Sequence, residues 1–352
     1  MKTSTLLICF LTTGLGFLYK GVCGQLDRNQ KNSPIDPIAE NMLAYQRSIG
    51  GWPKAVGKEL INYDKALAEI ERAAIKADSL RSDATIDNKA TSKEIRYLIK
   101  AFKANPDPRY LAAVQKGVDY LLEAQYGNGG WSQYYPDRST YRGEITYNDN
   151  AMINVLNILQ DIVEGTNDFD QLNDVYKNKA HLAVQKGISC ILKTQVTVNG
   201  TLTVWCAQYD EKTLKPAKAR AFELISLSGM ESVGITEFLM RIEKPSEEIK
   251  NAVNSAVDWF KKSKIEGYEF VFVEDPKDPK EKDKVLIAKS GSVIWARFYD
   301  IDTNEPFFSG RNSVKVKTVA EIEKERRVGY SWYGTWPANL LVTKYQVWLK
   351  KV

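Results

Sequence analysis

Residues 113–131 read AVQKGVDYLLEAQYGNGGW, and the start of this stretch returns as AVQKG at residues 183–187. In each copy a glutamine stands eight residues after the glycine, and a tryptophan follows it, Trp131 in the first copy and, more loosely, Trp205 in the second. Two helices and a return rich in glycine or aromatic residues fill each period of about seventy residues. The chain is therefore built from repeated helix hairpins.

The repeat extends in both directions. Residues 251–262, NAVNSAVDWFKK, form a third copy, and Gln46 with Trp52 resembles the end of an earlier one. A helix hairpin that cannot bury its own apolar face must stack on its neighbours. We therefore predict a mainly α-helical fold, an incomplete α/α toroid or barrel whose long returns form a central groove. Strands should be short, near residues 200–207 and 268–274, and residues 275–284 should form a charged loop.

The N-terminus has the pattern of an export signal. Lys2 precedes an apolar run at residues 6–18, which is too short to span a bilayer, and small residues follow it. We predict a signal peptide at residues 1–24, a linker at residues 25–37 and a catalytic domain at residues 38–352. The protein should be secreted or periplasmic, with no membrane contact once the signal is removed.

The charge balance excludes some partners. Removing residues 1–24 takes away Lys2 and Lys20 and no acidic residue, so the net charge falls from +5 to +3. This charge is too small to indicate nucleic-acid binding, and it does not repel a polyanionic substrate.

The single histidine, His181, limits the chemistry. A Ser-His-Asp triad has no nucleophile motif here, and zinc has too few ligands. Carboxylates, arginines, lysines or an oxygen-bound metal must therefore do the work. Cys190 and Cys206 remain after the signal peptide, either as a disulfide, which export permits, or as free buried thiols.

A basic stretch lies between residues 215 and 234. Lys215, Lys218 and Arg220 have no acidic residue among them, and Ser228 with Glu231 has the spacing of a helix capping box. A cationic loop that leads into a helix can bind an anion, although a solvated basic loop is the alternative.

Two loops place Asp beside Asn before an apolar helix, TIDN at residues 85–88 and TYNDN at residues 146–150. Each is explained by a helix N-cap when taken alone. As a pair on one rim of a repeat fold, their oxygens would suit calcium. A pair of catalytic carboxylates for glycoside hydrolysis, Asp87 and Asp149, is the competing functional interpretation.

Arginines and aromatic residues form the remaining patterns. Arg297 and Arg311 stand fourteen residues apart and either form structural ion pairs or clamp carboxylates with their planar forks. Several aromatic residues lie beside glycines in the returns, where they could fill the core or stack on sugar rings. They are Trp52, Trp131, Tyr134, Tyr135, Trp205, Tyr330, Trp332 and Trp336.

Eight segments together resemble the pectate lyases of polysaccharide lyase family ten, in family order from about residue 38 to the C-terminus. They are GGWPK (50–54), TIDN (85–88), GGWSQYYP (129–136), ITYNDNAM (145–152), TVWCAQYD (203–210), KPAKARAFELISLSGMESVGI (215–235), WARFYDIDTNEPFFSGR (295–311) and YSWYGTWP (330–337). Two positions differ from the family pattern: Lys54 stands where glutamine is frequent, and Asn150 where a second acid is frequent.

The resemblance implies a calcium-dependent pectate lyase that cleaves polygalacturonate by anti β-elimination to 4,5-unsaturated oligogalacturonides. By motif, Asp87, Asn148 and Asp149 correspond to the Ca²⁺ site, and Arg220 to the Brønsted base. The other two arginines, Arg297 and Arg311, correspond to contacts with substrate carboxylates that also serve catalysis. We expect further substrate contacts from Lys215, Lys218, Asn88, Tyr147, Trp205 and Trp332.

The base assignment has a physical condition. The ordinary pKa of arginine lies above about 12, so Arg220 would need nearby cations, such as Lys215, Lys218 or the metal, to disfavour its charged form. Two other functions stay open on the residues alone: an α/α-barrel glycoside hydrolase using Asp87 and Asp149, and a non-catalytic oligosaccharide-binding protein. In each case we expect a monomer whose partner is a polysaccharide.

Overall fold

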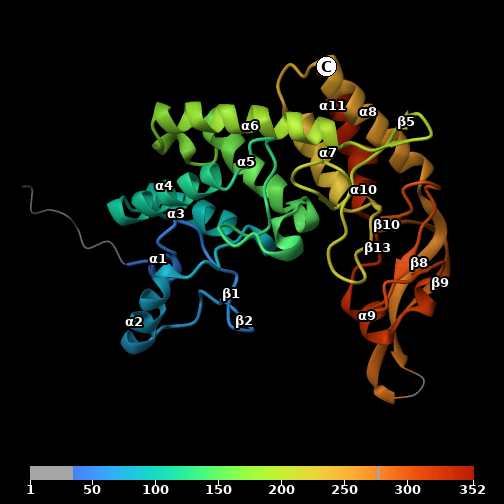
Figure 1. The fold of residues 1–352 in the computed structure, drawn as a ribbon, viewed down its shortest axis with the longest axis horizontal. Coiled ribbons are helices and arrows are strands. Elements are labelled where there is room, and N and C mark those ends of the chain that lie inside the picture. Colours follow the sequence, from blue (N-terminus) through green and yellow to red (C-terminus); the bar gives the residue numbers. More distant parts are fainter. Residues whose placement is uncertain (1–34, 276–277) are drawn as a thin grey trace, which may run out of the picture. The chain divides into compact units, whose positions relative to one another are not determined.

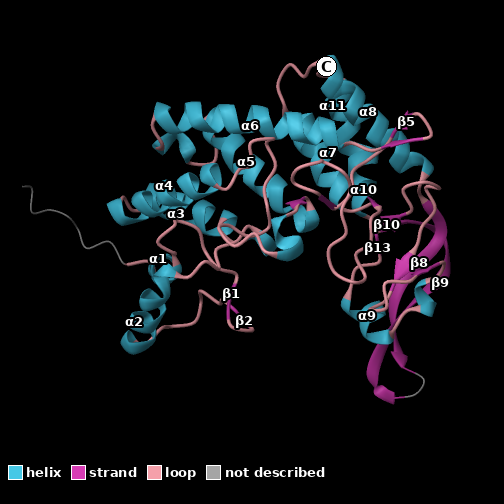
Figure 2. Cartoon of the chain, viewed as in Figure 1, coloured by secondary structure: helices cyan, strands magenta, loops and turns pink. Residues whose placement is uncertain are grey.

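The computed structural model describes residues 35–275 and 278–352. The expected signal peptide and nearly all of the expected linker therefore lie outside the described residues. Within residues 36–352, which form one compact unit, helices predominate (Figure 2). No helix among the described residues has both the length and the apolarity needed to cross a membrane.

Three helix hairpins follow one another along the chain (Figure 1). They are α3 (Ser92–Ala104) with α4 (Pro108–Glu123), α5 (Ala151–Glu164) with α6 (Asp174–Thr194), and α7 (Glu231–Arg241) with α8 (Glu247–Lys262). Helices α3, α5 and α7 contact one another in one row, and α4, α6 and α8 in a second row. This mainly helical arrangement confirms the fold class that the repeat predicts.

Further helices pack at the two ends of these rows. Helix α1 (Pro37–Tyr45) contacts α3 and α4, and α2 (Glu69–Ala77) packs on α1. At the other end a π-helical turn, η7 (Leu340–Lys344), packs on α7 and α8 between α10 (Trp336–Asn339) and α11 (Tyr345–Leu349). The short α9 (Lys324–Gly329) packs on β9 (Asp278–Ala296).

The repeated glutamines join each hairpin to the next. Each one donates a hydrogen bond from Nε2 to a backbone carbonyl at the same position of the following copy. The pairs are Gln46 to Ala113 at 2.9 Å, Gln125 to Ala183 at 2.9 Å and Gln195 to Ala252 at 3.0 Å. The seventy-residue period therefore continues through the third copy, and the early Gln46 belongs to the same series.

The repeated glycines make room for the tryptophan of the preceding copy. A Cβ atom at Gly117 would lie 2.9 Å from the ring of Trp52 and 2.7 Å from Ile95. At Gly187 it would lie 3.4 Å from the ring of Trp131. The indole of Trp131 also donates to the Leu121 carbonyl at 2.7 Å. Each ring is therefore held by its own repeat and packs against the next.

Most strands are short, but one hairpin is not. Strand β8 (Ile265–Asp275) pairs antiparallel with β9, and β13 (Tyr333–Gly334) pairs with the end of β9. The prediction of a charged loop at residues 275–284 is wrong, because residues 278–284 belong to β9. Lysines such as Lys284, which lies over the rings of Phe270 and Phe272, are compatible with an exposed two-stranded ribbon.

The other strands pair over two residues each. They are β1 (Ala55–Val56) with β2 (Glu59–Leu60), β3 (Ile145–Thr146) with β6 (Gln208–Tyr209), β4 (Thr197–Val198) with β5 (Thr201–Leu202), β7 (Leu227–Ser228) with β10 (Phe298–Tyr299), and β11 (Phe308–Ser309) with β12 (Lys315–Val316).

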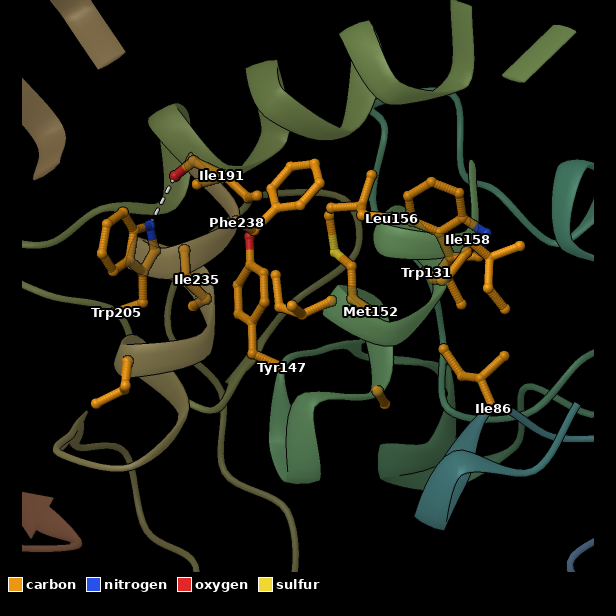
Figure 3. Packing of buried hydrophobic residues seen from close by; sticks show 14 of the residues in the cluster. Ile86, Trp131, Tyr147, Met152, Leu156, Ile158, Ile191, Trp205, Ile235 and Phe238 are labelled. Atoms are coloured by element: carbon orange, nitrogen blue, oxygen red, sulfur yellow. Dashed lines mark hydrogen bonds between the residues drawn. The ribbon is translucent and has the colours of Figure 1, made fainter. Parts of the chain in front are cut away.

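The core lies between the two rows of helices. Figure 3 shows Met152 and Leu156 of α5 with Ile191 of α6 and Phe238 of α7 around the repeated aromatic rings. Cys190 and Cys206 are both buried and free, so no disulfide joins them. Burial raises their thiol pKa values to about 11 and about 12, which keeps them unreactive.

Candidate active site

A cleft of about 400 Å³ collects five of the residues singled out in the sequence. They are Asp87, Asn88, Asn148, Asp149 and Arg220. Tyr134, one of the aromatic residues expected to fill the core or stack on sugars, also lines it. Further lining residues, for which the sequence indicates no site role, include Lys54, Gln133, Arg142, Gln208 and Glu223.

The repeat brings the acidic positions to one rim. The tryptophan carbonyl of each copy accepts a hydrogen bond from a backbone N–H: Trp52 from Thr85 at 3.0 Å, Trp131 from Thr146 at 3.0 Å and Trp205 from Ser228 at 2.8 Å. These three donors thus occupy equivalent positions. The residues three places further on are Asn88, Asp149 and Glu231, which are therefore equivalent too.

Neither Asp87 nor Asp149 caps a helix. The N-cap positions of α3 and α5 are Thr91 and Asn150, and neither makes a side-chain cap hydrogen bond. Asp87 and Asp149 lie instead in 3-10 turns, in which Asn88 (φ 49°) and Asp149 (φ 51°) have left-handed backbones. Asn and Asp adopt this conformation more readily than other residues with a Cβ atom, and it also occurs at functional sites. The N-cap explanation of the two loops is therefore wrong.

Arg297 lies behind the cleft rather than in its lining. It is 4% exposed, and its Nη2 donates to Glu231 at 2.5 Å and to the Oδ1 atoms of Asn148 and Asp149 at 3.3 Å each. Burial alone would lower the pKa of Arg297, but the charge of Glu231 raises it above the ordinary value. The protonated guanidinium therefore holds the Asn148–Asp149 turn from behind.

Arg220 reaches the cleft with a carboxylate already bound to it. Its Nε donates to Glu223 Oε2 at 2.6 Å, a second hydrogen bond runs from Nη2 to Oε1, and the guanidinium lies over the ring of Phe222. Tyr330 donates to the same carboxylate at 2.9 Å. The hydrogen bond from Glu223 raises the pKa of Arg220 and outweighs the lowering by burial. This environment is the opposite of the one that a neutral arginine base needs.

Lys54 contacts the other acidic loop. Its Nζ donates a short hydrogen bond to Oδ2 of Asp87, whose side chain is nearly buried. Burial lowers the pKa of Lys54, but the hydrogen bond to Asp87 and its charge outweigh this effect, so the pKa is raised. Lys54 is therefore a cation in direct contact with a predicted metal ligand.

The donor set fits a hard cation. Asp87, Asn148 and Asp149 offer only carboxylate and amide oxygens, which calcium prefers. The carboxylates Asp87, Asp149 and Glu231 outnumber their direct ion-pair partners, Lys54 and Arg297, by one, and Arg142 also lines the cleft.

A separate acidic group was not predicted. Glu144, Asp210 and Glu211 bring one oxygen each within 4.8 Å of one another. Burial, with the charges of the other two, raises the pKa of Glu144 to about 7.

Three of the predicted basic residues do not line the cleft. Arg311 has a side chain that is 61% exposed and pairs with Glu325 at 2.7 Å. Lys215 and Lys218 are exposed on the loop that leads to Arg220. The structure thus brings Arg220 to the acidic rim and leaves these three side chains outside it.

The substrate contacts predicted for Tyr147, Trp205 and Trp332 are wrong. All three side chains are 0% exposed. Tyr147 shares a hydrogen bond of 2.9 Å with Thr194, and Figure 3 shows it and Trp205 in the core. These rings fill the returns of the repeat, which leaves no face for a sugar. Tyr134, whose ring lies 4.7 Å from the Arg142 guanidinium, is an aromatic side chain that does reach the cleft.

Lys54, Glu223 and Glu231 are the residues that the sequence reasoning missed. In the sequence, Lys54 differs from a family pattern and Glu231 fits the spacing of a capping box, and neither feature indicates a site residue. The predicted capping box does not form, because the N-cap of α7 is Met230 and the N–H of Ser228 donates to Trp205. Glu231 accepts instead from the hydroxyl of Ser228 with one oxygen and from Arg297 with the other. The repeat position that Glu231 shares with Asp149 is the signal that could have identified it.

Comparisons with known proteins find a matching sequence family and similar solved structures. The sequence model described as pectic acid lyase matches residues 46–341. Two solved structures of a family 10 polysaccharide lyase from Cellvibrio cellulosa are similar, each at 34% identity with a TM-score of 0.75. One of them is a substituted form in complex with trigalacturonic acid, and the match covers 88% of this chain and 92% of that one. The match to the other structure covers 88% of this chain and 91% of that one. No curated protein sequence matches. The chain therefore belongs to the pectic acid lyase family and is an enzyme of the pectate lyase class.

Proposed function

We propose that this pectate lyase is secreted, requires calcium and cleaves polygalacturonate by anti β-elimination to 4,5-unsaturated oligogalacturonides. The observation that carries the proposal is the acidic rim of Asp87, Asn148 and Asp149 in the same cleft as Arg220. The trigalacturonic acid bound to the related Cellvibrio enzyme supports the substrate class.

The reaction removes the proton on C5 of a galacturonate, forms the C4–C5 double bond and expels the oxygen on C4. Negative charge develops on the adjacent carboxylate, and stabilising that charge is usually the largest catalytic contribution. When bound, calcium supplies this stabilisation as a Lewis acid, held by Asp87, Asp149 and Asn148. These residues would hold the cation against the carboxylate of the sugar, which the two aspartates alone would repel, and water would protonate the leaving oxygen.

Arg220 is the proposed base, on condition that Glu223 releases it. Two hydrogen bonds from Arg220 to Glu223 favour the charged guanidinium, which cannot accept a proton. The side chain of Arg220 is 45% exposed while that of Glu223 is 5% exposed, so Arg220 is the partner that can move. A shift of Arg220 towards the substrate would both break this contact and bring the guanidinium to C5.

Arg297 serves the reaction indirectly. It is buried and bonded to Asn148 and Asp149, so it sets the position of two side chains that line the cleft. We assign it a positioning role in place of direct contact with the substrate carboxylate.

The polymer would extend beyond the acidic rim. A second hollow of about 340 Å³ shares Tyr134 and Arg142 with the cleft. Arg142 makes only a loose ion pair with Asp137, at 3.7 Å, so its planar donors are available to a second galacturonate carboxylate.

Incubation with polygalacturonate tests the proposal. A lyase produces ultraviolet absorbance from the new ring double bond. A hydrolase would produce reducing ends without it, and a binding protein would produce neither. Chelation should abolish the absorbance, and calcium should restore it better than magnesium, which requires tighter octahedral coordination. Full activity after exhaustive chelation would refute the calcium requirement.

Secretion rests on the N-terminal signal pattern. Expression of the full chain should yield a mature protein that begins near Gln25, as N-terminal sequencing would show. An intact Met1 in the active protein would contradict export through this signal.

A further inference from the structure

Lys54 and Arg297 neutralise the two predicted metal-binding aspartates in different ways. The side chain of Arg297 is 5% exposed and tied to Glu231, whose side chain is 0% exposed, so it cannot leave Asp149 without unpairing a buried carboxylate. Among the described residues Lys54 makes its one ion pair with Asp87, it also interacts with the hydroxyl of Tyr134, and its side chain is 30% exposed. Its ammonium therefore has a route out of the contact, whereas the guanidinium of Arg297 does not.

The backbone of Lys54 is fixed while its side chain has room. Its carbonyl accepts a hydrogen bond from Ile61 at 3.1 Å, and Trp52, two residues earlier, is fully buried. The four-carbon side chain points into the cleft beside Tyr134. Rotation of that side chain alone can move the ammonium away from Asp87.

We propose that Lys54 is an internal competitor of the metal, whose ammonium must leave Asp87 before this carboxylate can bind calcium. The inference rests on the proposed calcium requirement and adds a residue that sets the metal affinity. Lys54 contacts Oδ2 of Asp87, so calcium on either oxygen of this carboxylate would lie close to the ammonium, and the two cations repel strongly because the surrounding dielectric is low. Part of the binding energy of calcium is therefore used to displace Lys54. The displaced ammonium stays in the cleft, where it can pair with a substrate carboxylate.

Calcium binding without polymer tests the competition directly. Isothermal titration calorimetry with calcium chloride, on the chelator-stripped full protein, gives the dissociation constant without reference to activity. Lys54→Met keeps the chain length and removes the charge. It should tighten calcium binding at least about tenfold, since the competing unit charge lies in contact with a ligand.

A neighbouring lysine provides the matched control. Lys58 lies four residues further on, is exposed, and forms no ion pair among the described residues. Lys58→Met removes the same charge from the same hairpin, so it should change the dissociation constant less than twofold. The effect of Lys54→Met should also disappear in an Asp87→Asn background, because the neutral amide no longer holds the ammonium.

Each outcome decides the inference. Tighter binding in Lys54→Met alone supports it, including the case in which the wild type binds calcium too weakly to measure. Unchanged or weaker binding in a Lys54→Met protein that melts like the wild type overturns it, and so does an equal gain in Lys58→Met. Chelator-resistant lyase activity in the wild type would instead refute the proposed calcium requirement. The two failures are therefore distinguishable.

Discussion

Replacing Arg297 with methionine tests the assignment of this residue as a buried positioning group. Arg297→Met removes the 2.5 Å contact to Glu231 and the 3.3 Å contact to Asp149. A hydrogen bond between charged partners is worth about 1.5–3 kcal/mol, and it is barely screened here because both Arg297 and Glu231 are buried. The substitution also strands the carboxylate of Glu231. Loss of one partner of a buried pair destabilises a protein by about 3–5 kcal/mol, which is the expected decrease in unfolding free energy.

Urea denaturation followed by tryptophan fluorescence measures this loss. The unfolding midpoint of Arg297→Met should fall without a change in slope, since the folded state stays compact. A second substitution, Glu231→Gln, should restore part of the stability in the Arg297→Met background, because it removes the stranded charge. In the wild-type background Glu231→Gln should be destabilising.

Three results would refute the reasoning. A loss below about 1 kcal/mol in Arg297→Met would mean that the ion pair with Glu231 is not a significant buried interaction. Absence of any rescue by Glu231→Gln would mean that the loss comes from repacking and not from a stranded carboxylate. A stable Arg297→Met protein whose KM alone has risen would return Arg297 to the role of a direct substrate contact.

Three further predictions concern other parts of the molecule. Gln125→Ala should lower the unfolding free energy by about 0.5–1.5 kcal/mol, because it removes the hydrogen bond to the Ala183 carbonyl, which keeps its bond within α6; a loss equal to that of an exposed glutamine would contradict this. Glu144→Gln should stabilise the protein at pH 8 and not at pH 4, as seen in thermal melting. Burial raises the pKa of Glu144 to about 7, so the wild type loses stability as the pH rises from about 4.5 to 7 and this carboxylate ionises. Glu223→Gln should move the rising limb of the pH–kcat profile to lower pH, because the carboxylate that raises the pKa of Arg220 is gone; an unmoved limb would mean that Arg220 does not titrate in the rate.

The fold follows from the repeat because the repeated residues make repeated contacts. Gln46, Gln125 and Gln195 bond equivalent carbonyls, so a sequence period translates directly into a structural one. The β8–β9 hairpin has no such signature. Its dense charges resemble those of a loop, and only the pairing of the two strands, which is a tertiary property, makes them a ribbon.

The candidate site was predictable where it depends on the backbone and unpredictable where it depends on side-chain partners. Asp87 and Asp149 could be placed on one rim because each opens a repeat unit. The burial of Trp205 could not be read from composition, because a glycine-flanked tryptophan in a return can face either the core or the solvent. The ion-pair partners of Arg220 and Arg297 could not be predicted from the sequence either, because Glu223 and Glu231 contact these arginines only in the folded chain.

Those partners narrow the choice of base among the three arginines. Arg311 is exposed and does not line the cleft. Arg297 is paired with Glu231, and neither side chain can move without leaving a buried charge unpaired. Deprotonation of the Arg297 guanidinium is therefore strongly disfavoured. Arg220 alone of the three lines the cleft beside the acidic rim, on a side chain exposed enough to leave its carboxylate. If one of these three arginines accepts the C5 proton in this enzyme, it must be Arg220, and the Arg220–Glu223 contact must open before each turnover.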